Sequence, residues 1–256
     1  MMAFDLVSFD LDGTLVDTAS EIAEAANRAL ESHGIARRPA EEVQRLIGGG
    51  TRELMLKLLA RAMLATPALA DRVRPEGVLA SMDEHYAATT GTTGTPYAGA
   101  LPTLLALKRA GVRLACVTNK EAHHAERVLR AHGLERAFDL VLGGDTLPVK
   151  KPDAGVLRHV MRHLRGTAER TAHVGDSRID IEAARAAGVA AWAVPWGYNA
   201  GEPIDTARPD RIFDSLADVA RHVLAGVRPA DVPDPRGVLE GETLPALKIL
   251  ARRAAG

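Results

Sequence analysis

The hydrophobic positions nearest the N-terminus predict a buried strand that ends in two acidic residues. The run from Leu6 to Leu11 is rich in aliphatic and aromatic side chains, and Gly13 then lets the chain turn. Asp10 and Asp12 lie two positions apart, so their carboxylates point to the same side of the strand. Two neighbouring carboxylates raise each other's pKa unless a cation or a proton lies between them. The pair indicates a metal site, a proton-transfer site or both; the alternative is an ordinary acidic turn.

The next part of the chain has apolar residues at helical spacing and no convincing strand before Thr90. Thr18 or Ser20 is the expected start of the first helix, which His33 and Gly34 end. The helices expected here cover residues 18–30, 39–47, a segment after Thr51, and 75–88. Residues 18–92 are therefore predicted to form a helical subdomain inserted after the first strand.

From Tyr97 onward, strand and helix patterns alternate. The expected strands are 112–117, 138–142, 171–174, 190–194 and 212–213, and the expected helices are 102–109, 121–131, 153–164, 179–187 and 215–225. Such alternation predicts an α/β fold, a parallel sheet with helices on both faces, built from residues 1–17 and 93–226. Residues 227–256 begin with a proline-rich linker and are expected to form either a docking helix or a disordered tail.

Composition narrows the class of protein. The 256 residues are 46% hydrophobic and 25% charged with a formal net charge of −1, so nothing favours a nucleic-acid partner. Cys116, the single cysteine, excludes an internal disulfide and a cysteine-rich metal site, and its apolar neighbours predict a small buried side chain. No signal peptide or membrane-spanning run is recognisable, so a cytoplasmic enzyme without a membrane partner is expected.

Polar residues follow four of the predicted elements, in positions where a parallel sheet binds its ligands. They are the pair Asp10 and Asp12, the pair Thr118 and Asn119, Lys151, and Asp176 with Ser177 and Asp180. Each has an ordinary alternative, such as a strand-end hydroxyl, a solvated loop lysine or a turn acid. Their joint order favours one site, because the carboxyl ends of parallel strands converge on the same edge of the sheet.

These residue types suit phosphoryl transfer. Asp10 can attack phosphorus, and Mg²⁺ held by Asp10, the Asp12 main-chain carbonyl and Asp176 would screen the repulsion between the anions. Thr118 can donate hydrogen bonds to phosphoryl oxygens, and Lys151 can neutralise Asp10 and the charge that develops during transfer. Asp180 is placed to orient Lys151 or a metal-bound water.

The motifs resemble those of the haloacid dehalogenase superfamily of phosphatases. They are DLDGT (10–14), VTN (117–119), KP (151–152) and GDSRID (175–180). The resemblance implies a Rossmann-like core with an inserted α-helical cap and Mg²⁺ as cofactor, with Asp10 as nucleophile and Asp12 as acid/base. Thr14 and Asn119 are candidates for substrate binding.

Within this superfamily the chain is most similar to the phosphoglycolate phosphatase subfamily. The segments that carry this are LVDT (15–18), IGGG (47–50), VTNK (117–120), LPVKKP (147–152) and WGYNAGEPI (196–204). Ile179 departs from the asparagine common in that subfamily, and residues beyond about 227 lie outside its pattern.

Substrate specificity is expected to come from the cap. The backbone at Gly49 and Gly50 can approach a ligand closely, and Arg52 could bind a carboxylate, as in 2-phosphoglycolate. The alternative is a hinge between two cap helices, with Arg52 in solvent. His123 and His124 are predicted to be surface helix residues, and Trp196 and Tyr198 to anchor a loop.

Three functions remain open from sequence alone. The first is a Mg²⁺-dependent phosphatase for a small phosphorylated metabolite, acting through an aspartyl phosphate as a monomer or homodimer. The second is a sugar phosphomutase on the same scaffold, which interconverts phosphate esters without releasing phosphate. The third is a receiver-like module phosphorylated on Asp10, for which a nearby acid/base such as Asp12 would be a disadvantage because it shortens the life of the aspartyl phosphate.

Overall fold

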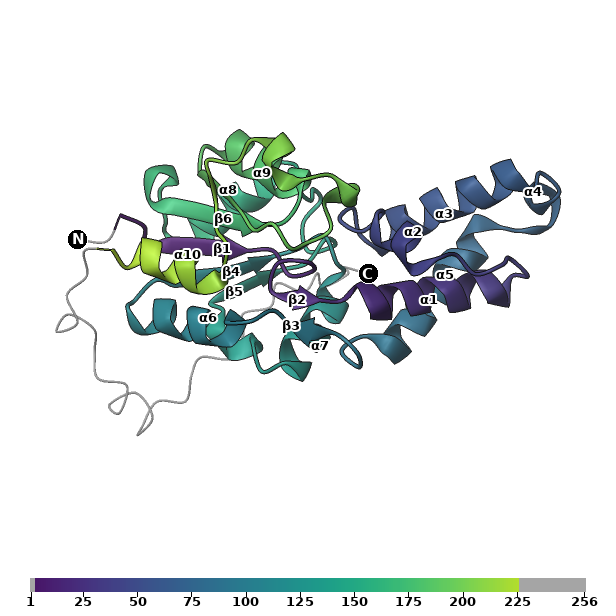
Figure 1. Ribbon diagram of the computed structural model, residues 1–256, viewed down its shortest axis with the longest axis horizontal. Coiled ribbons are helices and arrows are strands. Elements are labelled where there is room, and N and C mark those ends of the chain that lie inside the picture. The colour runs from purple at the N-terminus through teal and green to yellow at the C-terminus, as the bar shows by residue number, and fades with distance from the viewer. Residues whose placement is uncertain (1–2, 226–256) are drawn as a thin grey trace, which may run out of the picture.

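A six-stranded parallel sheet forms the centre of the protein, whose computed structural model describes residues 3–225. The strand order is β5-β4-β1-β6-β7-β8, with β1 between β4 and β6 (Figure 1). The strands are β1 (Leu6–Phe9), β4 (Arg113–Val117), β5 (Leu140–Leu142), β6 (Thr171–Gly175), β7 (Ala190–Ala193) and β8 (Arg211–Ile212). The α/β fold predicted from the alternating pattern is confirmed.

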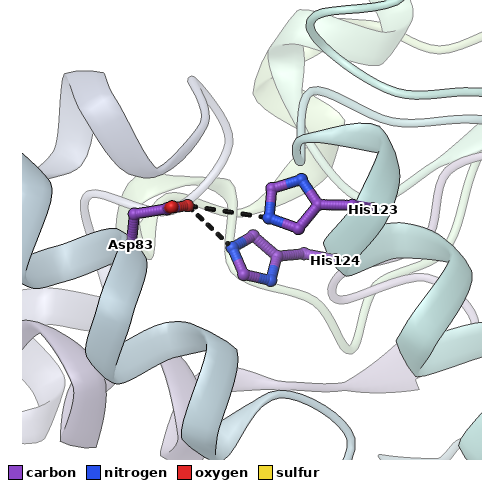
Figure 2. Close-up of side chains that lie close together, drawn as sticks. All are labelled: Asp83, His123 and His124. Carbon is purple, nitrogen blue, oxygen red and sulfur yellow. Dashed lines mark hydrogen bonds and ion pairs between the residues drawn. The ribbon is translucent and has the colours of Figure 1, made fainter. Parts of the chain in front are cut away.

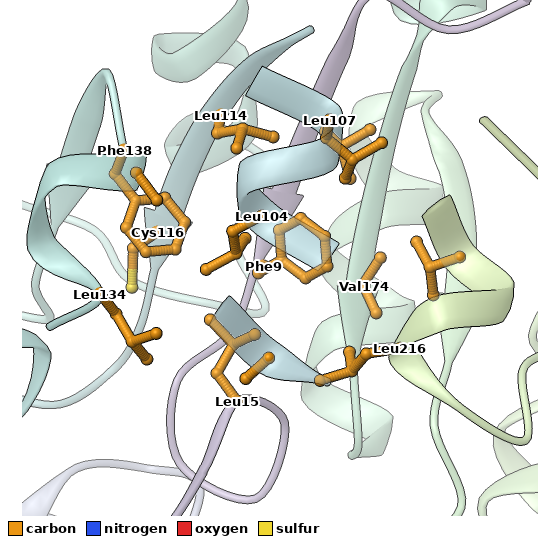
Figure 3. Close-up of a cluster of buried hydrophobic side chains, with 14 of the residues drawn as sticks. Phe9, Leu15, Leu104, Leu107, Leu114, Cys116, Leu134, Phe138, Val174 and Leu216 are labelled. Atoms are coloured by element: carbon orange, nitrogen blue, oxygen red, sulfur yellow. The ribbon is translucent and has the colours of Figure 1, made fainter. Parts of the chain in front are cut away.

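Helices cover both faces of this sheet. One face carries α6 (Ala100–Arg109), α7 (Ala122–Ala131) and α10 (Leu216–Val223), and the other carries α8 (Gly155–Leu164) and α9 (Arg178–Ala187). Residues of β1 alternate between two separate cores, because successive side chains of a strand point to opposite faces. Phe9 packs with Leu104 of α6 and Leu216 of α10 (Figure 3), whereas Leu6 packs with the core beneath α8 and α9. Cys116 is buried in the first core, as expected.

A separate group of helices lies to one side of the sheet and has its own hydrophobic core (Figure 1). These cap helices are α1 (Ala19–Ser32), α2 (Ala40–Gln44), α3 (Thr51–Ala65), α4 (Leu69–Arg72) and α5 (Pro75–Thr89). Helix α1 packs against α5 along the cap. Tyr86 is the largest fully buried side chain of this core, which also contains Met55 and Met82. All of these helices lie inside the range 18–92 that the sequence analysis assigned to an insert.

A two-stranded antiparallel ribbon joins the cap to the sheet. It consists of β2 (Val16–Asp17) and β3 (Thr95–Pro96), which pair through Val16 with Pro96 and Asp17 with Thr95. This ribbon and α4 were not predictable from the sequence, because elements of two to four residues are too short to show a hydrophobic period. No helix within residues 3–225 combines the length and the apolar character needed to cross a membrane. The helix or disorder expected for residues 227–256 lies outside the described residues.

Candidate active site

The acidic pair lies at the carboxyl end of the central strand β1. The Asp10 amide donates to the carbonyl of Val174 on β6 at 2.9 Å, so the parallel pairing continues one residue beyond the strand. Thr118 and Asn119 follow β4 on one side of β1, and Asp176 follows β6 on the other. The sheet order therefore brings these separate parts of the sequence to one edge, as predicted for a parallel sheet.

Lys151 is a buried cation between two of the acids. Its Nζ lies 2.8 Å from Oδ1 of Asp10 and 2.7 Å from Oδ1 of Asp180, and it donates to the Val117 carbonyl at 2.7 Å. Burial would lower the pKa of Lys151, but the two carboxylates raise it above its usual value. Burial raises the pKa of Asp10 to about 7, although the Lys151 ammonium acts in the opposite direction. The lysine is thus held charged beside Asp10.

Asp176 is held in a fixed orientation by the residues around it. Its Oδ1 accepts from the Thr14 hydroxyl at 3.0 Å and its Oδ2 from the Tyr198 amide at 2.7 Å. Burial, followed by the charges of Asp180 and Asp10, raises the pKa of Asp176 well above its usual value. Gly197 makes this geometry possible, since a Cβ atom there would lie 2.1 Å from Oδ2 of Asp176.

Asp180 connects Lys151 to the start of helix α9. Its Oδ2 accepts from the amide of Ser177 at 3.1 Å and from the Ser177 hydroxyl at 2.7 Å, in a capping box. Its Oδ1 contacts His173 Nε2 at 3.2 Å as well as Lys151. Burial alone would raise the pKa of Asp180, but Lys151 and His173 hold it well below its usual value. On the other side of the His173 ring, Nδ1 lies 2.9 Å from the hydroxyl of Ser8.

Asp12 has a different set of partners from Asp10. Its Oδ1 accepts from the Thr18 hydroxyl at 2.6 Å and lies 2.6 Å from Nζ of Lys120. The Lys120 ammonium also donates to the hydroxyl of Tyr86, a buried residue of cap helix α5. Both of these contacts to Asp12 use Oδ1. The two aspartates therefore have separate lysines and different surroundings.

The donor set fits a hard divalent cation. Asp10, Asp176 and Asp180 each offer a carboxylate oxygen, and these three atoms lie within 4.8 Å of one another. Carboxylate oxygens are the ligands that Mg²⁺ prefers, and Asp180 is already paired with Lys151. The pKa values of Asp10 and Asp176 are raised in the protein without a metal, which shows that ionising these clustered carboxyl groups is costly unless a further cation, such as Mg²⁺, lies between them.

A pocket opens between this edge of the sheet and the cap. Its lining consists of Asp10, Asp12, Ile22, Ile47, Gly48, Gly50, Thr51, Leu54, Thr118, Asn119, Lys120, Asp176, Ser177 and Tyr198. Asn119 Nδ2 donates to the carbonyls of Gly48 and Lys151, both at 2.9 Å, and so ties the cap loop to the lysine loop. The backbone at Gly50 approaches Asn119 so closely that a Cβ atom there would lie 2.8 Å from the Asn119 carbonyl oxygen.

The predicted site residues occupy three kinds of position. Asp10, Asp12, Thr118, Asn119, Gly50, Asp176 and Ser177 line the pocket. Thr14, Lys151 and Asp180 are buried and do not line the pocket. Thr14 contacts Asp176 and Lys151 contacts Asp10, whereas Asp180 contacts Lys151 and Ser177. Gly49 is buried and its carbonyl accepts from Lys150, whereas Arg52 is exposed on the first turn of α3 and does not line the pocket.

Three residues of the site were not identified from sequence. Lys120 lies in a quoted motif, but no pattern in the sequence shows that it contacts Asp12. His173 is an ionisable residue in the middle of a buried strand, and that was the available signal. Tyr198 anchors its loop as expected, but it also lines the pocket, and its hydroxyl accepts from the amides of Thr18 and Ala19 at the start of α1.

The expectation that His123 and His124 are both surface residues is wrong for His124. The His123 side chain is exposed, but that of His124 is buried where α5 of the cap packs over α7. Its ring centroid lies 4.5 Å from that of Tyr86. The local pattern of α7 could not show this, because the covering residues are supplied by a helix more than 30 residues earlier.

A family model, curated proteins and a solved structure all match this chain, and they agree on the family of hydrolases. A family model described as haloacid dehalogenase-like hydrolase matches residues 4–188. The phosphoglycolate phosphatase of Vibrio cholerae is 36% identical over 224 residues, which cover 88% of this chain and 99% of the relative. A phosphoglycolate phosphatase of Cupriavidus necator is 40% identical over 210 residues, 82% of this chain and 89% of the relative. The crystal structure of a predicted phosphoglycolate phosphatase from Haemophilus somnus aligns with a TM-score of 0.81 at 32% identity, over 86% of this chain and 98% of that chain.

Proposed function

The chain belongs to the haloacid dehalogenase-like hydrolases and is a phosphoric monoester hydrolase, and we propose that it hydrolyses 2-phosphoglycolate to glycolate and phosphate. The observation that carries the mechanism is the arrangement of the two aspartates. Asp10 lies against Lys151, whereas Asp12 lies against Lys120 and Thr18. Two carboxylates in different surroundings can take different roles.

In the proposed reaction Asp10 attacks phosphorus and forms an aspartyl phosphate, while the bond from phosphorus to the ester oxygen breaks. Asp12 gives a proton to that departing oxygen, and glycolate leaves. Asp12 then takes a proton from a water, which attacks the same phosphorus and releases phosphate and free Asp10. The ammonium of Lys151 offsets the negative charge gathered at Asp10 and the phosphoryl group in both steps.

Mg²⁺ is the proposed cofactor, with Asp10, Asp176 and the main-chain carbonyl of Asp12 as its protein ligands. When bound, it supplies Lewis-acid polarisation of the phosphoryl group and charge compensation for the carboxylates. The chain's own contribution is to keep those ligands oriented. Thr14 and the Tyr198 amide hold Asp176, and Ser177 and His173 hold Asp180, which in turn positions Lys151.

Thr118 and Asn119 are the proposed contacts for the phosphoryl oxygens, because both line the pocket next to Asp10. Asn119 would donate through its main-chain amide, since both hydrogens of its side-chain Nδ2 are already donated to the carbonyls of Gly48 and Lys151. For the carboxylate of 2-phosphoglycolate we propose Arg52. Its neighbours Gly50 and Thr51 line the pocket, and within residues 3–225 no hydrogen bond or ion pair holds its exposed guanidinium elsewhere. A guanidinium binds a carboxylate through two parallel hydrogen bonds. The names of the relatives support this choice of substrate.

The substrate is tested by phosphate release in Mg²⁺ from 2-phosphoglycolate, ethyl phosphate, sugar phosphates and pyrophosphate. The proposal expects the highest kcat/KM for 2-phosphoglycolate. It is overturned if 2-phosphoglycolate is inert while another ester is hydrolysed, and the reaction class then stands without this substrate. Interconversion of sugar phosphates without phosphate release would instead identify the phosphomutase alternative.

The role of Arg52 is tested separately with Arg52→Gln. We expect KM for 2-phosphoglycolate to rise about 10-fold or more, as for the loss of a charged hydrogen bond, and KM for ethyl phosphate to stay unchanged. Arg61→Gln, on the same helix, is the matched control and should alter neither constant. Equal KM values for Arg52→Gln and wild type would remove Arg52 from the site.

The cytoplasmic location of the protein and its monomeric or homodimeric state stay predictions.

A further inference from the structure

Three potential metal ligands meet where the cap packs on the core, away from the aspartates of the active site. Asp83 comes from helix α5 of the cap, and His123 and His124 come from the start of α7 (Figure 2). Oδ1 of Asp83 lies 3.6 Å from Nε2 of His123 and 3.3 Å from Nε2 of His124. The two imidazole rings lie side by side, with centroids 3.8 Å apart, and both face the carboxylate.

The spacing of these atoms fits a tetrahedral metal ion. Ligand atoms at about 2.1 Å from a tetrahedral Zn²⁺ are roughly 3.4 Å apart, close to both separations from the Asp83 oxygen. The three atoms all lie within 4.8 Å of one another, so small side-chain rotations would complete the geometry. Two imidazoles and one carboxylate form a borderline-soft donor set, which favours Zn²⁺, Ni²⁺ or Co²⁺ over Mg²⁺.

The surroundings of His124 match those of a metal-binding histidine. Its side chain is 1% exposed, and burial favours the neutral ring that coordinates a metal. The second ring nitrogen, Nδ1, lies 3.3 Å from the hydroxyl of Thr90, and Tyr86 packs against the ring. A hydrogen bond at the second nitrogen is what fixes the orientation of a ligating imidazole.

We propose that Asp83, His123 and His124 form a binding site for a divalent transition-metal ion, Zn²⁺ foremost, with water in the fourth position. This site is separate from the oxygen-ligand site at Asp10 and does not depend on the proposed substrate. Its ligands come from both parts of the protein, so the bound ion joins α5 of the cap to α7 of the core. Binding to the folded protein alone should also stabilise it.

The test is a titration of the full chain with Zn²⁺ in the presence of saturating Mg²⁺. Isothermal titration calorimetry measures how many Zn²⁺ ions bind and how tightly. Wild type should bind one Zn²⁺ per chain at this site, and Asp83→Ala and His123→Ala should each weaken that binding at least 10-fold. The Asp83 and His123 side chains are 67% and 59% exposed, so these variants keep the fold, which circular dichroism checks. His124 is buried and is therefore left unchanged.

The matched control is His163→Ala on α8. His163 and His159 form another stacked histidine pair, with ring centroids 6.0 Å apart. The competing explanation is that any such histidine pair binds Zn²⁺, in which case this pair would bind it too. The proposal expects His163→Ala to bind Zn²⁺ like wild type. It is overturned if wild type binds no Zn²⁺, or if Asp83→Ala and His123→Ala bind it as tightly as wild type. With Co²⁺ as the probe, tetrahedral binding should give strong visible absorption that both variants lose.

Discussion

Lys120 of the core lies 2.6 Å from Asp12 and at the same time donates a hydrogen bond to Tyr86 of the cap. Its ammonium also lies over the Tyr86 ring, 5.0 Å from the centroid. The proposed acid/base is therefore connected to helix α5 of the cap through a single side chain. Proton transfer by Asp12 should depend on this lysine, and more weakly on the tyrosine.

The first prediction concerns Lys120→Met, which keeps the length of the side chain and removes its charge. Asp12 loses the cation that positions its Oδ1, so kcat should fall about 10- to 100-fold, part of what a positioned acid/base contributes. KM should change less. Steady-state phosphate release checks this, with Lys57→Met on the cap surface as control. A kcat equal to that of wild type would show that Lys120 does not position Asp12.

The second prediction concerns Tyr86→Phe, which removes the hydroxyl and keeps the ring. Loss of one hydrogen bond to a charged group should cost about 1.5–3 kcal/mol of unfolding free energy, measured by urea denaturation. The effects on kcat of Tyr86→Phe and Lys120→Met should be non-additive, because the tyrosine acts through the lysine. Additive effects in the double variant would contradict the connection.

The edge of the sheet that carries the site was predictable because the rule for parallel sheets is topological. Asp10, Thr118 and Asp176 follow strands that a hydrophobic pattern identifies, and the motifs around them indicated the hydrolase family that the comparisons confirm. The helical spacing of α1, α2, α3 and α5 predicted an insert in the same way.

The contacts inside the site were less predictable, because they depend on packing between distant segments. The sequence predicts Lys151 as the cation beside Asp10, and the two groups lie 2.8 Å apart, but nothing in the local sequence shows that Lys120 would pair with Asp12. The burial of His124 depends on residues of α5 that pack against it, and the β2–β3 ribbon is too short for a recognisable pattern.

The third prediction concerns Tyr198→Phe at the junction of core and cap. The Tyr198 hydroxyl accepts from the amides of Thr18 and Ala19 at 2.9 and 3.0 Å and donates to Asp17 at 2.7 Å. Its removal leaves two amides at the start of α1 without this acceptor, so the unfolding free energy should fall by about 1–3 kcal/mol. Urea denaturation measures this difference in unfolding free energy. An unfolding free energy equal to that of wild type would show that water replaces the hydroxyl.

The fourth prediction concerns the pH dependence of stability through His173. Burial, and to a smaller extent Lys151, lower the pKa of this histidine, although Asp180 acts in the opposite direction. The folded protein therefore keeps the ring neutral where the unfolded chain, with a histidine pKa of about 6.5, takes up a proton. Stability should be lost as the pH falls below that value, by up to about 1.4 kcal/mol per pH unit.

The variant His173→Gln lacks this titrating group, so its unfolding free energy should fall less than that of wild type between pH 7 and pH 5. Both proteins are compared in Mg²⁺, so that the carboxylates of the site contribute equally. Parallel curves for the two proteins would show that His173 takes up its proton equally in the folded and unfolded states.

The central claim is that Asp10 is the nucleophile, and phosphate release by Asp10→Asn tests it most directly. The substitution keeps the size of the side chain and removes its nucleophilic oxygen, while Asp214→Asn controls for the loss of an exposed carboxylate. With Mg²⁺ and 2-phosphoglycolate or a general aryl phosphate, the rate should fall by roughly 10³-fold or more for Asp10→Asn and stay unchanged for Asp214→Asn. Hydrolysis by Asp10→Asn at the wild-type rate would contradict the account.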